Sequence, residues 1–516
     1  MTAAVVTRTP RVLGRRRGGG ARGEAPFAAV AAALTLGTLL LHLSQLHQSI
    51  FGDELWTLQQ VAGRSFGAML HAIRPPGENA PPLFFILAWA AARLGEPSVW
   101  YRLPSLIFGA ATVPALYLLG RQTVGRWAGL FAAAAFALSP FATYYGIEAR
   151  PYAATAFFVV LAALAVVAAV RRERVGWWVL YALAAAAAAY SGYTSVFALV
   201  TLAAWSLWVC RARPARPLLA NAGVVALYAP WLPHVGARQL AVIGFLEPFT
   251  VHHALDDLLR VTVGYPYASV RAIPTLGGLA IIGGCLLGSA LTLALARLGS
   301  RPAARLTAEP WLPHVAPRLT AEPPDRSAPA EPGGLGLLVA LALATPIGLA
   351  LYSLLATDIW DPRDLYASLP AALLLAGALV ASLAPAPRAL VALAVLATLG
   401  FGTARALGPF ARPQFRVAAA YLDRVAGPRD PVVLYPSFLD LDADIPAQLK
   451  RPHRILDGLP RRWPAPPPGG MMFVIFDGRL QGRGRVPLPH PPGYVFAGAR
   501  QYGGLVPFTV ATYRPA

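Results

Sequence analysis

Charged residues are scarce in this sequence. Asp, Glu, Lys and Arg make up 13% of its 516 residues, whereas soluble domains contain about 25%. In their place, 56% of the residues are hydrophobic, and they stand in long runs that suit lipid as the surrounding solvent. The composition therefore predicts a polytopic α-helical membrane protein rather than a series of soluble domains.

Other common signatures are missing as well. The two cysteines, Cys210 and Cys285, lie in apolar runs without a partner nearby in sequence, which argues against a disulfide or a metal site. There is no glycine-rich phosphate loop, no HExxH and no GxSxG. The formal charge of +20 comes mostly from arginines in short loops rather than from a basic stripe, so no nucleic-acid partner is expected.

Long apolar runs predict the architecture. A helix needs about 20 apolar residues to cross a bilayer, and about eleven runs meet or approach that length, which gives a transmembrane domain over residues 27–407. The predicted spans are Phe27–His47, Val99–Gly120, Trp127–Tyr145, Tyr152–Val170, Gly176–Tyr190, Thr194–Cys210, Leu218–Val235, Pro274–Leu298, Leu335–Ala356, Leu365–Ala384 and Ala389–Leu407. Residues 1–26 carry six arginines and are expected to be a disordered cytoplasmic arm.

One further apolar run, Pro81–Leu94, is too short to be assigned by length alone, and the distribution of charge decides its interpretation. If it does not cross the membrane, the arginine-rich loops are all cytoplasmic, as the positive-inside rule requires; if it does cross, they all lie outside. These loop residues are Arg121, Arg126, Arg171, Arg172, Arg174, Arg211, Arg213, Arg216, Arg297, Arg301, Arg305 and Arg388. The run is therefore predicted to be an interfacial or re-entrant helix in a first outer loop, residues 48–98.

Two regions outside the spans differ in character. Residues 299–334 are rich in Pro, Ala and Arg and repeat the stretch Arg-Leu-Thr-Ala-Glu-Pro, which is typical of a flexible linker, here cytoplasmic. Residues 408–516 are expected to form a small extracytoplasmic α/β domain. Its predicted elements are a helix at Pro413–Val425 and strands at Pro431–Tyr435 and Met471–Phe476.

The adjacent carboxylates Asp53 and Glu54 are the most informative polar residues. They follow the first span in an apolar stretch, where charges are costly unless they are solvated or used. A structural alternative is that Asp53 caps a helix that begins at Leu55. The residues alone leave both interpretations open.

More polar residues fall on the same predicted side. Glu148, Arg150 and Tyr152 belong to a short outer loop, where the first two form either a surface ion pair of little value or part of a cavity shared with Asp53. Arg363 lies outside against the positive-inside trend, and its planar fork of donors suits a lipid phosphate.

Two other charged residues flank the interfacial helix. Glu78 precedes it, and Arg102 opens the next span, where its side chain either reaches toward the interface or binds a phosphate.

The order and sidedness of these motifs resemble a known family. After the acidic pair come Pro81-Pro-Leu-Phe-Phe85, Arg102-Leu-Pro-Ser105, Leu119-Gly-Arg121, Ser139-Pro140, Glu148-Ala-Arg-Pro-Tyr152 and Pro362-Arg363. In this order they are similar to the bacterial family-39-type glycosyltransferases, relatives of the dolichyl-phosphate-mannose protein mannosyltransferases and of the aminoarabinose lipid A transferases. The resemblance is strongest over residues 48–155 and implies the GT-C architecture.

The resemblance also implies an activity. It implies an enzyme of the bacterial inner membrane that moves a sugar from a polyprenyl-phosphate donor to a lipid, glycan or protein acceptor on the extracytoplasmic face, with inversion. Asp53 would be the general base, and Glu54 would position the acceptor or tune Asp53. The implied substrate-binding residues are Glu78, Arg102, Glu148, Arg150, Tyr152 and Arg363. No metal ligand and no cofactor are assigned, and a divalent cation stays an open alternative.

Two departures from the family pattern leave the sugar unidentified. Glu78-Asn79-Ala80 stands where many relatives have a histidine before the Pro-Pro pair, and Asp364 follows Arg363 where many have an aromatic residue.

A transporter or flippase of a lipid-linked saccharide is the main alternative function. Such a protein is expected to show internal repeats and charged or broken helices at the midplane, and the sequence has neither. A polymerase or ligase of surface glycans and a non-catalytic membrane protein are further alternatives.

Overall fold

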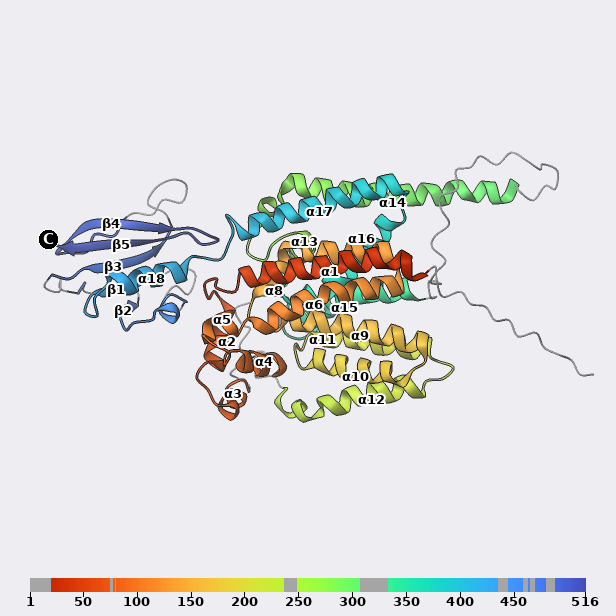
Figure 1. The fold of residues 1–516 in the computed structure, drawn as a ribbon, viewed down its shortest axis with the longest axis horizontal. Helices are drawn as coiled ribbons and strands as arrows, with labels where there is room; N and C mark the ends of the chain where they lie inside the picture. The colour runs from red at the N-terminus through yellow and green to blue at the C-terminus, as the bar shows by residue number, and fades with distance from the viewer. Residues whose placement is uncertain are drawn as a thin grey trace, which may run out of the picture.

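Alanine- and leucine-rich runs form a long helical bundle, and a small sheet domain stands at one end of it (Figure 1). The computed structural model describes residues 20–74, 78, 80–235, 248–306, 333–434, 444–457, 463–464, 469–478 and 488–516. The bundle helices are α1 (Gly20–Ser44), α6 (Leu103–Thr123), α7 (Arg126–Ala137), α8 (Pro140–Ile147), α9 (Tyr152–Arg172), α10 (Val175–Ala189), α11 (Ser195–Val209), α12 (Ala215–Tyr228), α13 (Val251–Val263), α14 (Leu276–Leu306), α15 (Gly334–Leu355), α16 (Leu369–Ala381) and α17 (Pro385–Leu407).

Within the described residues, seven helical segments are long and apolar enough to cross a membrane, or up to eight if the bent pair α7–α8 is one span. The two halves of that pair meet at 62°, where Ser139 caps the start of α8 and its hydroxyl accepts a hydrogen bond from the Ala142 N–H at 3.2 Å. Three of the predicted spans form the shorter helices α10, α11 and α12, of 15, 15 and 14 residues. At 1.5 Å per residue these helices are shorter than the ~30 Å hydrocarbon core.

Small residues let the central helices approach closely. A Cβ atom on Gly120 of α6 would lie 2.4 Å from the Cα of Gly129 in α7, and one on Gly377 of α16 would lie 2.5 Å from the carbonyl oxygen of Ala128. Close van der Waals packing of this kind holds helices together in lipid, where the hydrophobic effect between helices is absent. Helices α6 and α9 both begin beside the polar residues described below.

Four short helices of the first loop lie at the same end of the bundle as the sheet domain (Figure 1). They are α2 (Asp53–Val61), α3 (Phe66–Ala72), α4 (Leu83–Ala91) and α5 (Pro97–Trp100). With nine residues, α4 is far too short to cross a bilayer, which confirms that Pro81–Leu94 does not form a spanning helix. Its buried face, with Phe84 and Phe85, packs in a cluster that includes Tyr101 and Trp231.

The C-terminal domain is a five-stranded mixed sheet in the order β2-β1-β3-β5-β4. Its strands are β1 (Pro431–Leu434), β2 (Arg454–Asp457), β3 (Met472–Asp477), β4 (Tyr494–Tyr502) and β5 (Phe508–Pro515). β1 pairs in parallel with β2 and β3, while β5 pairs antiparallel with β3 and β4. Helix α18 (Phe415–Val425) buries Phe415 and Leu422 against Phe473 of the sheet, so the predicted helix and both predicted strands are confirmed.

Two predicted boundaries need comment. Helix α1 already begins at Gly20, inside the arm predicted as disordered, and residues 1–19 lie outside the described part of the chain. The predicted linker over residues 299–334 starts as helix, because α14 continues to Leu306; residues 307–332 lie outside the description.

Candidate active site

Helix α2 brings the acidic pair to the end of the bundle that carries the sheet domain. Gly52 has φ +58°, which glycine adopts without steric cost, so the chain turns directly from Phe51 into α2. Asp53 and Glu54 then occupy the first turn, where the positive end of the helix dipole favours carboxylates. The alternative that Asp53 caps a helix starting at Leu55 is wrong, because Gly52 holds the cap position.

Glu54 is completely buried and holds the start of α6 against the end of the first span. Its carboxylate accepts hydrogen bonds from Arg102 Nε at 2.9 Å and Nη2 at 2.6 Å. The remaining Arg102 donors reach the carbonyl oxygens of Leu46, Gln48 and Ser49 at 2.7–2.9 Å. All five Arg102 N–H groups are therefore used, and none is left for a phosphate. These bonds favour a structural role for Arg102 over the predicted substrate-binding one.

A second arginine, Arg412, pairs with the same carboxylate from the far end of the chain. It lies between α17 and α18, forms an ion pair with Glu54, and places its guanidinium 4.8 Å from the ring centroid of Tyr144. The backbone N–H of Ala149 also donates to Glu54, at 2.8 Å. Burial raises the pKa of Glu54, but Arg102 and Arg412 lower it more, so the pKa lies below its ordinary value and the group is ionised.

Asp53 points to a different arginine. It forms an ion pair with Arg363, which is also held by Asp361 at 2.6 Å. The Asp53 side chain is 30% exposed and that of Arg363 is 20% exposed. Burial raises the pKa of Asp53, but the charges of Arg363 and Arg150 together lower it more. The pKa of Asp53 therefore lies below its usual value. Asp53 is an ionised carboxylate that solvent can reach.

Arg150 binds Glu78 rather than its sequence neighbour. Its two terminal nitrogens donate to the two carboxylate oxygens of Glu78 at 3.0 and 3.2 Å, and both side chains are nearly buried. The alternative of an exposed Glu148–Arg150 pair is therefore wrong. Tyr152 follows at the start of α9, where its ring packs edge-to-face against that of Tyr145 with the centroids 5.0 Å apart.

Glu148 is the one carboxyl group of the predicted set that no arginine binds directly. It is 1% exposed, one oxygen accepts a hydrogen bond from the Tyr144 hydroxyl at 3.3 Å, and the other has no hydrogen-bond partner. Burial raises the pKa of Glu148 to about 8, with Arg412 opposing and the charges of Asp53 and Glu54 adding to the rise. Glu148 is thus mostly protonated at neutral pH.

This protonation predicts a pH-dependent stability. Because the folded-state pKa lies above the ordinary value of 4.5, the folded protein is expected to lose stability as the pH rises from about 4.5 to about 8. One pKa unit corresponds to about 1.4 kcal/mol, so the loss should be a few kcal/mol. Glu148→Gln should remove most of this slope while keeping the shape of the side chain.

The measurement is the unfolding midpoint of both proteins in detergent at pH 5 and at pH 8.5. Relative to the wild type, the variant should have a higher unfolding midpoint at pH 8.5 than at pH 5. Parallel pH curves for the two proteins would show that Glu148 is ionised at neutral pH.

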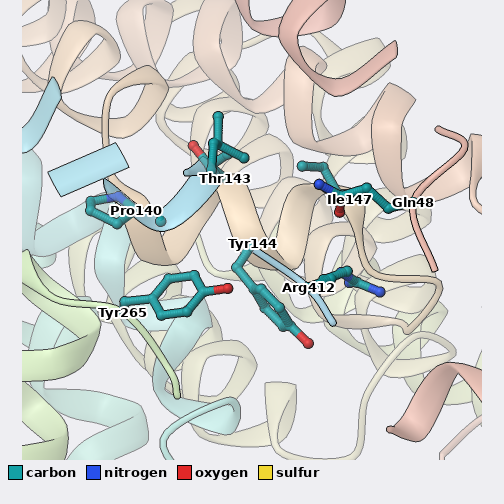
Figure 2. A pocket seen from close by; sticks show the side chains of 9 residues that line it. Gln48, Pro140, Thr143, Tyr144, Ile147, Tyr265 and Arg412 are labelled. Atoms are coloured by element: carbon teal, nitrogen blue, oxygen red, sulfur yellow. The ribbon is translucent and has the colours of Figure 1, made fainter. Parts of the chain in front are cut away.

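Tyrosines surround this charge cluster. Tyr144 contacts Tyr145, Tyr265 and Tyr267 through edge-to-face rings with centroids 5.1–5.5 Å apart. Figure 2 shows a cavity beside them, with the Tyr144 ring and Arg412 together on one side. The volume of this cavity is ≈ 10 Å³, which is about enough for one water molecule.

The structure brings all eight predicted residues to one end of the bundle, but in different states. Asp53, Arg363 and Tyr152 are partly exposed, whereas Glu54, Arg102, Glu78, Arg150 and Glu148 are buried. Sequence reasoning missed Arg412. The argument that singled out Arg363 also applies to Arg412, because Arg412 follows the last predicted span and so lies on the predicted outer side. Among the described residues, no group of three or more His, Cys, Asp or Glu side chains is arranged to hold a metal ion.

Known proteins resemble this chain in part of its sequence and in its fold. Residues 79–234 match the family model of dolichyl-phosphate-mannose-protein mannosyltransferase. A comparison with curated protein sequences found no match. Among solved structures, ArnT from Cupriavidus metallidurans in the apo state matches with a TM-score of 0.51 and 12% identity, over 89% of this chain and 93% of that chain.

Two further matches have lower TM-scores. The same ArnT bound to undecaprenyl phosphate gives 0.49 at 12% identity, over 96% of this chain and 98% of that one. The Archaeoglobus fulgidus oligosaccharyltransferase in the apo form gives 0.44 at 13% identity, over 83% and 64%. The partial family match bears out the predicted family resemblance, and the fold shared with apo ArnT bears out the predicted GT-C-like fold class.

Proposed function

We propose that the chain transfers a sugar from a polyprenyl-phosphate donor to an acceptor hydroxyl, with Asp53 as the general base. The observation that carries this proposal is the accessible Asp53–Arg363 ion pair, in a site whose other predicted carboxylates and arginines are buried. An ionised, solvent-accessible carboxylate can take a proton, and an arginine beside it can bind the phosphate of the donor.

The two side chains suit the two halves of the reaction. The acceptor oxygen attacks the anomeric carbon, its proton passes to Asp53, and the bond from that carbon to the phosphate oxygen breaks with its electrons going to the phosphate. The transition state has oxocarbenium character, and Arg363 stabilises the charge that grows on the leaving phosphate. One base without a covalent nucleophile gives inversion at the anomeric carbon.

Arg363 also couples donor binding to the state of Asp53. In the free protein the guanidinium is shared by Asp53 and Asp361. A donor phosphate competes with Asp53 for those N–H groups, and its arrival leaves the carboxylate oxygen available to the acceptor hydroxyl. Asp361 keeps Arg363 in place during the exchange.

The arrangement of charge along the bundle supports an extracytoplasmic site. Helix α6 starts beside Glu54 and ends near Arg121, and α9 starts after Arg150 and ends at Arg172. Each has 21 residues, so these arginines lie about 30 Å away, at the other end. Since arginine-rich loops stay cytoplasmic, the site faces the outside of the bacterial inner membrane.

Protein reconstituted in liposomes tests this function. With a sugar-labelled polyprenyl phosphate and a mixture of lipid, glycan and peptide acceptors, we expect labelled product with the anomeric configuration opposite to that of the donor, as read by NMR. A nucleotide sugar should not replace the lipid donor. A product with retained configuration would refute the single-base mechanism. Movement of the intact donor across the bilayer without any product would favour the flippase alternative.

A further inference from the structure

A groove in the C-terminal domain runs between α18 and the edge strand β4. Four residues come from α18 and its N-cap, at a spacing that places them on one face of the helix, and three come from the end of β4. The lining residues are Gln414, Val417, Tyr421, Arg424, Arg500, Gln501 and Tyr502. The volume is ≈ 350 Å³, which falls within the range of small-ligand sites, about 300–1,000 Å³.

The lining of the groove is basic and rich in hydrogen-bonding groups. It contains two arginines and no carboxylate, and neither arginine forms an ion pair within the described part of the chain. The Arg500 guanidinium lies 4.2 Å from the ring centroid of Tyr421, a stacking contact that orients its planar donors. Arg424 and Arg500 are exposed, so both charges are available to a ligand.

Polar neighbours extend this surface beyond the two charges. The side-chain amides of Gln414 and Gln501 both donate and accept hydrogen bonds, as sugar hydroxyls do. Tyr502 is only 6% exposed, and its hydroxyl has no partner. Among these lining residues only Val417 is aliphatic, so the groove offers little to an acyl chain.

The groove is attached to the candidate active site through the turn between β4 and β5. The Leu505 N–H donates to the carbonyl oxygen of Ala411 at 2.7 Å. Gly504 has φ +110°, and a Cβ atom there would lie 2.8 Å from the carbonyl oxygens of Ala411 and Arg412. Only glycine fits this position without displacing the backbone. The turn that follows β4 therefore packs against the backbone of Arg412, whose side chain pairs with Glu54.

We propose that this groove binds an anionic saccharide segment of the acceptor, with sugars that carry carboxylate or phosphate groups. The two arginines bind the acidic groups, and the two glutamines bind neighbouring hydroxyls. The contact of the β4–β5 turn with Ala411 and Arg412 ties the groove to the charge cluster around Glu54. This inference rests on the proposed transferase function and names the chemical class of its acceptor.

Binding without any donor tests the groove separately from sugar transfer. The probes are tetragalacturonate and the neutral maltotetraose, titrated calorimetrically into the full-length chain in nanodiscs of neutral lipid. We expect tetragalacturonate to bind at least about tenfold more tightly and to weaken as salt is added. Arg424→Gln and Arg500→Gln should each weaken it about tenfold, since a hydrogen bond to a charged group contributes ~1.5–3 kcal/mol and 1.4 kcal/mol is tenfold.

Arg514→Gln is the matched control, because Arg514 is an exposed arginine of the same domain on β5 that does not line the groove. It should leave the affinity unchanged. Equal binding of the two tetrasaccharides, or groove variants that behave like the control, would overturn the proposal. A third result would also overturn it: no binding of tetragalacturonate, together with binding to anionic lipid vesicles that both groove variants lose. The groove would then be a membrane contact. Intact saccharide binding in a protein that transfers no sugar would refute the transferase function and leave the groove assignment standing.

Discussion

Replacing Asp53 with asparagine is expected to reduce the turnover of sugar transfer by about 10²–10⁴-fold, the contribution typical of a general base. Asparagine keeps the size of the side chain and still accepts a hydrogen bond from Arg363. It cannot take the proton of the acceptor hydroxyl. The effect should therefore fall on the chemical step, measured in single-turnover reactions with saturating donor and acceptor.

Folding and donor binding should change little in this variant. Arg363 keeps its bond to Asp361 at 2.6 Å, so no buried charge is left without a partner. The lost pair is partly exposed, and such pairs contribute ~0–1 kcal/mol. The KM for the donor should stay constant or fall, because the phosphate no longer competes with a carboxylate for Arg363.

Asp256→Asn is the matched control. Asp256 pairs with Arg260 one turn along α13 at 2.5 Å and is about as exposed as Asp53, so it tests the loss of a carboxylate from an ion pair that does not include Arg363. Turnover should be unaffected there. If Asp53→Asn raised the KM for the donor and left turnover intact, Asp53 would be a binding residue, and the base would have to be sought elsewhere.

The sequence predicted the features of this protein that depend on periodicity and on the sign of charge. Hydrophobic runs identified the helices because lipid-facing segments must be apolar along their whole length. Arginine loops separated the two ends of the bundle, and this placed Asp53, Glu148 and Arg363 together although they are far apart in sequence. In the C-terminal domain, the amphipathic pattern of α18 and the apolar strand β3 were sufficient to predict both elements.

Pairing within the site could not be predicted in the same way. Arg150 lies two residues from Glu148, yet it binds Glu78, 72 positions away, at 3.0 Å. Arg412 reaches Glu54 across 358 positions. The type and sidedness of Arg102 are compatible with reaching toward the interface or with binding a phosphate, and only the folded chain shows that loop carbonyls already use its donors. Sidedness limits which residues can meet, but packing decides which of them do.

Replacing Glu54 with glutamine is expected to destabilise the folded protein by about 3–5 kcal/mol, the cost of breaking a buried ion pair by removing one partner. Glu54 is fully buried together with Arg102, and Arg412 is 3% exposed. A neutral amide would leave two buried guanidinium groups without their counter-charge. The carboxylate joins the start of α2, the start of α6, the Ala149 loop and the segment before α18, so its loss should loosen the first loop and the C-terminal domain together.

Glu96→Gln supplies the control for this change. Glu96 pairs with Arg416 at 3.3 Å and is 46% exposed, so its replacement should cost ~0–1 kcal/mol. The measurement is the denaturant or thermal midpoint of both variants in detergent, together with the yield of folded protein.

The double variant Glu54→Gln/Arg412→Gln separates a structural role of Glu54 from a chemical one. It removes one stranded guanidinium along with the carboxylate, so its destabilisation should be smaller than the sum of the two single changes, as expected for groups in direct contact. Any protein that folds should retain a large part of its turnover, because Asp53 and Arg363 are untouched. A Glu54→Gln protein with wild-type stability and no activity would contradict this account and would favour the role that the resemblance implies, in which Glu54 positions the acceptor or tunes Asp53.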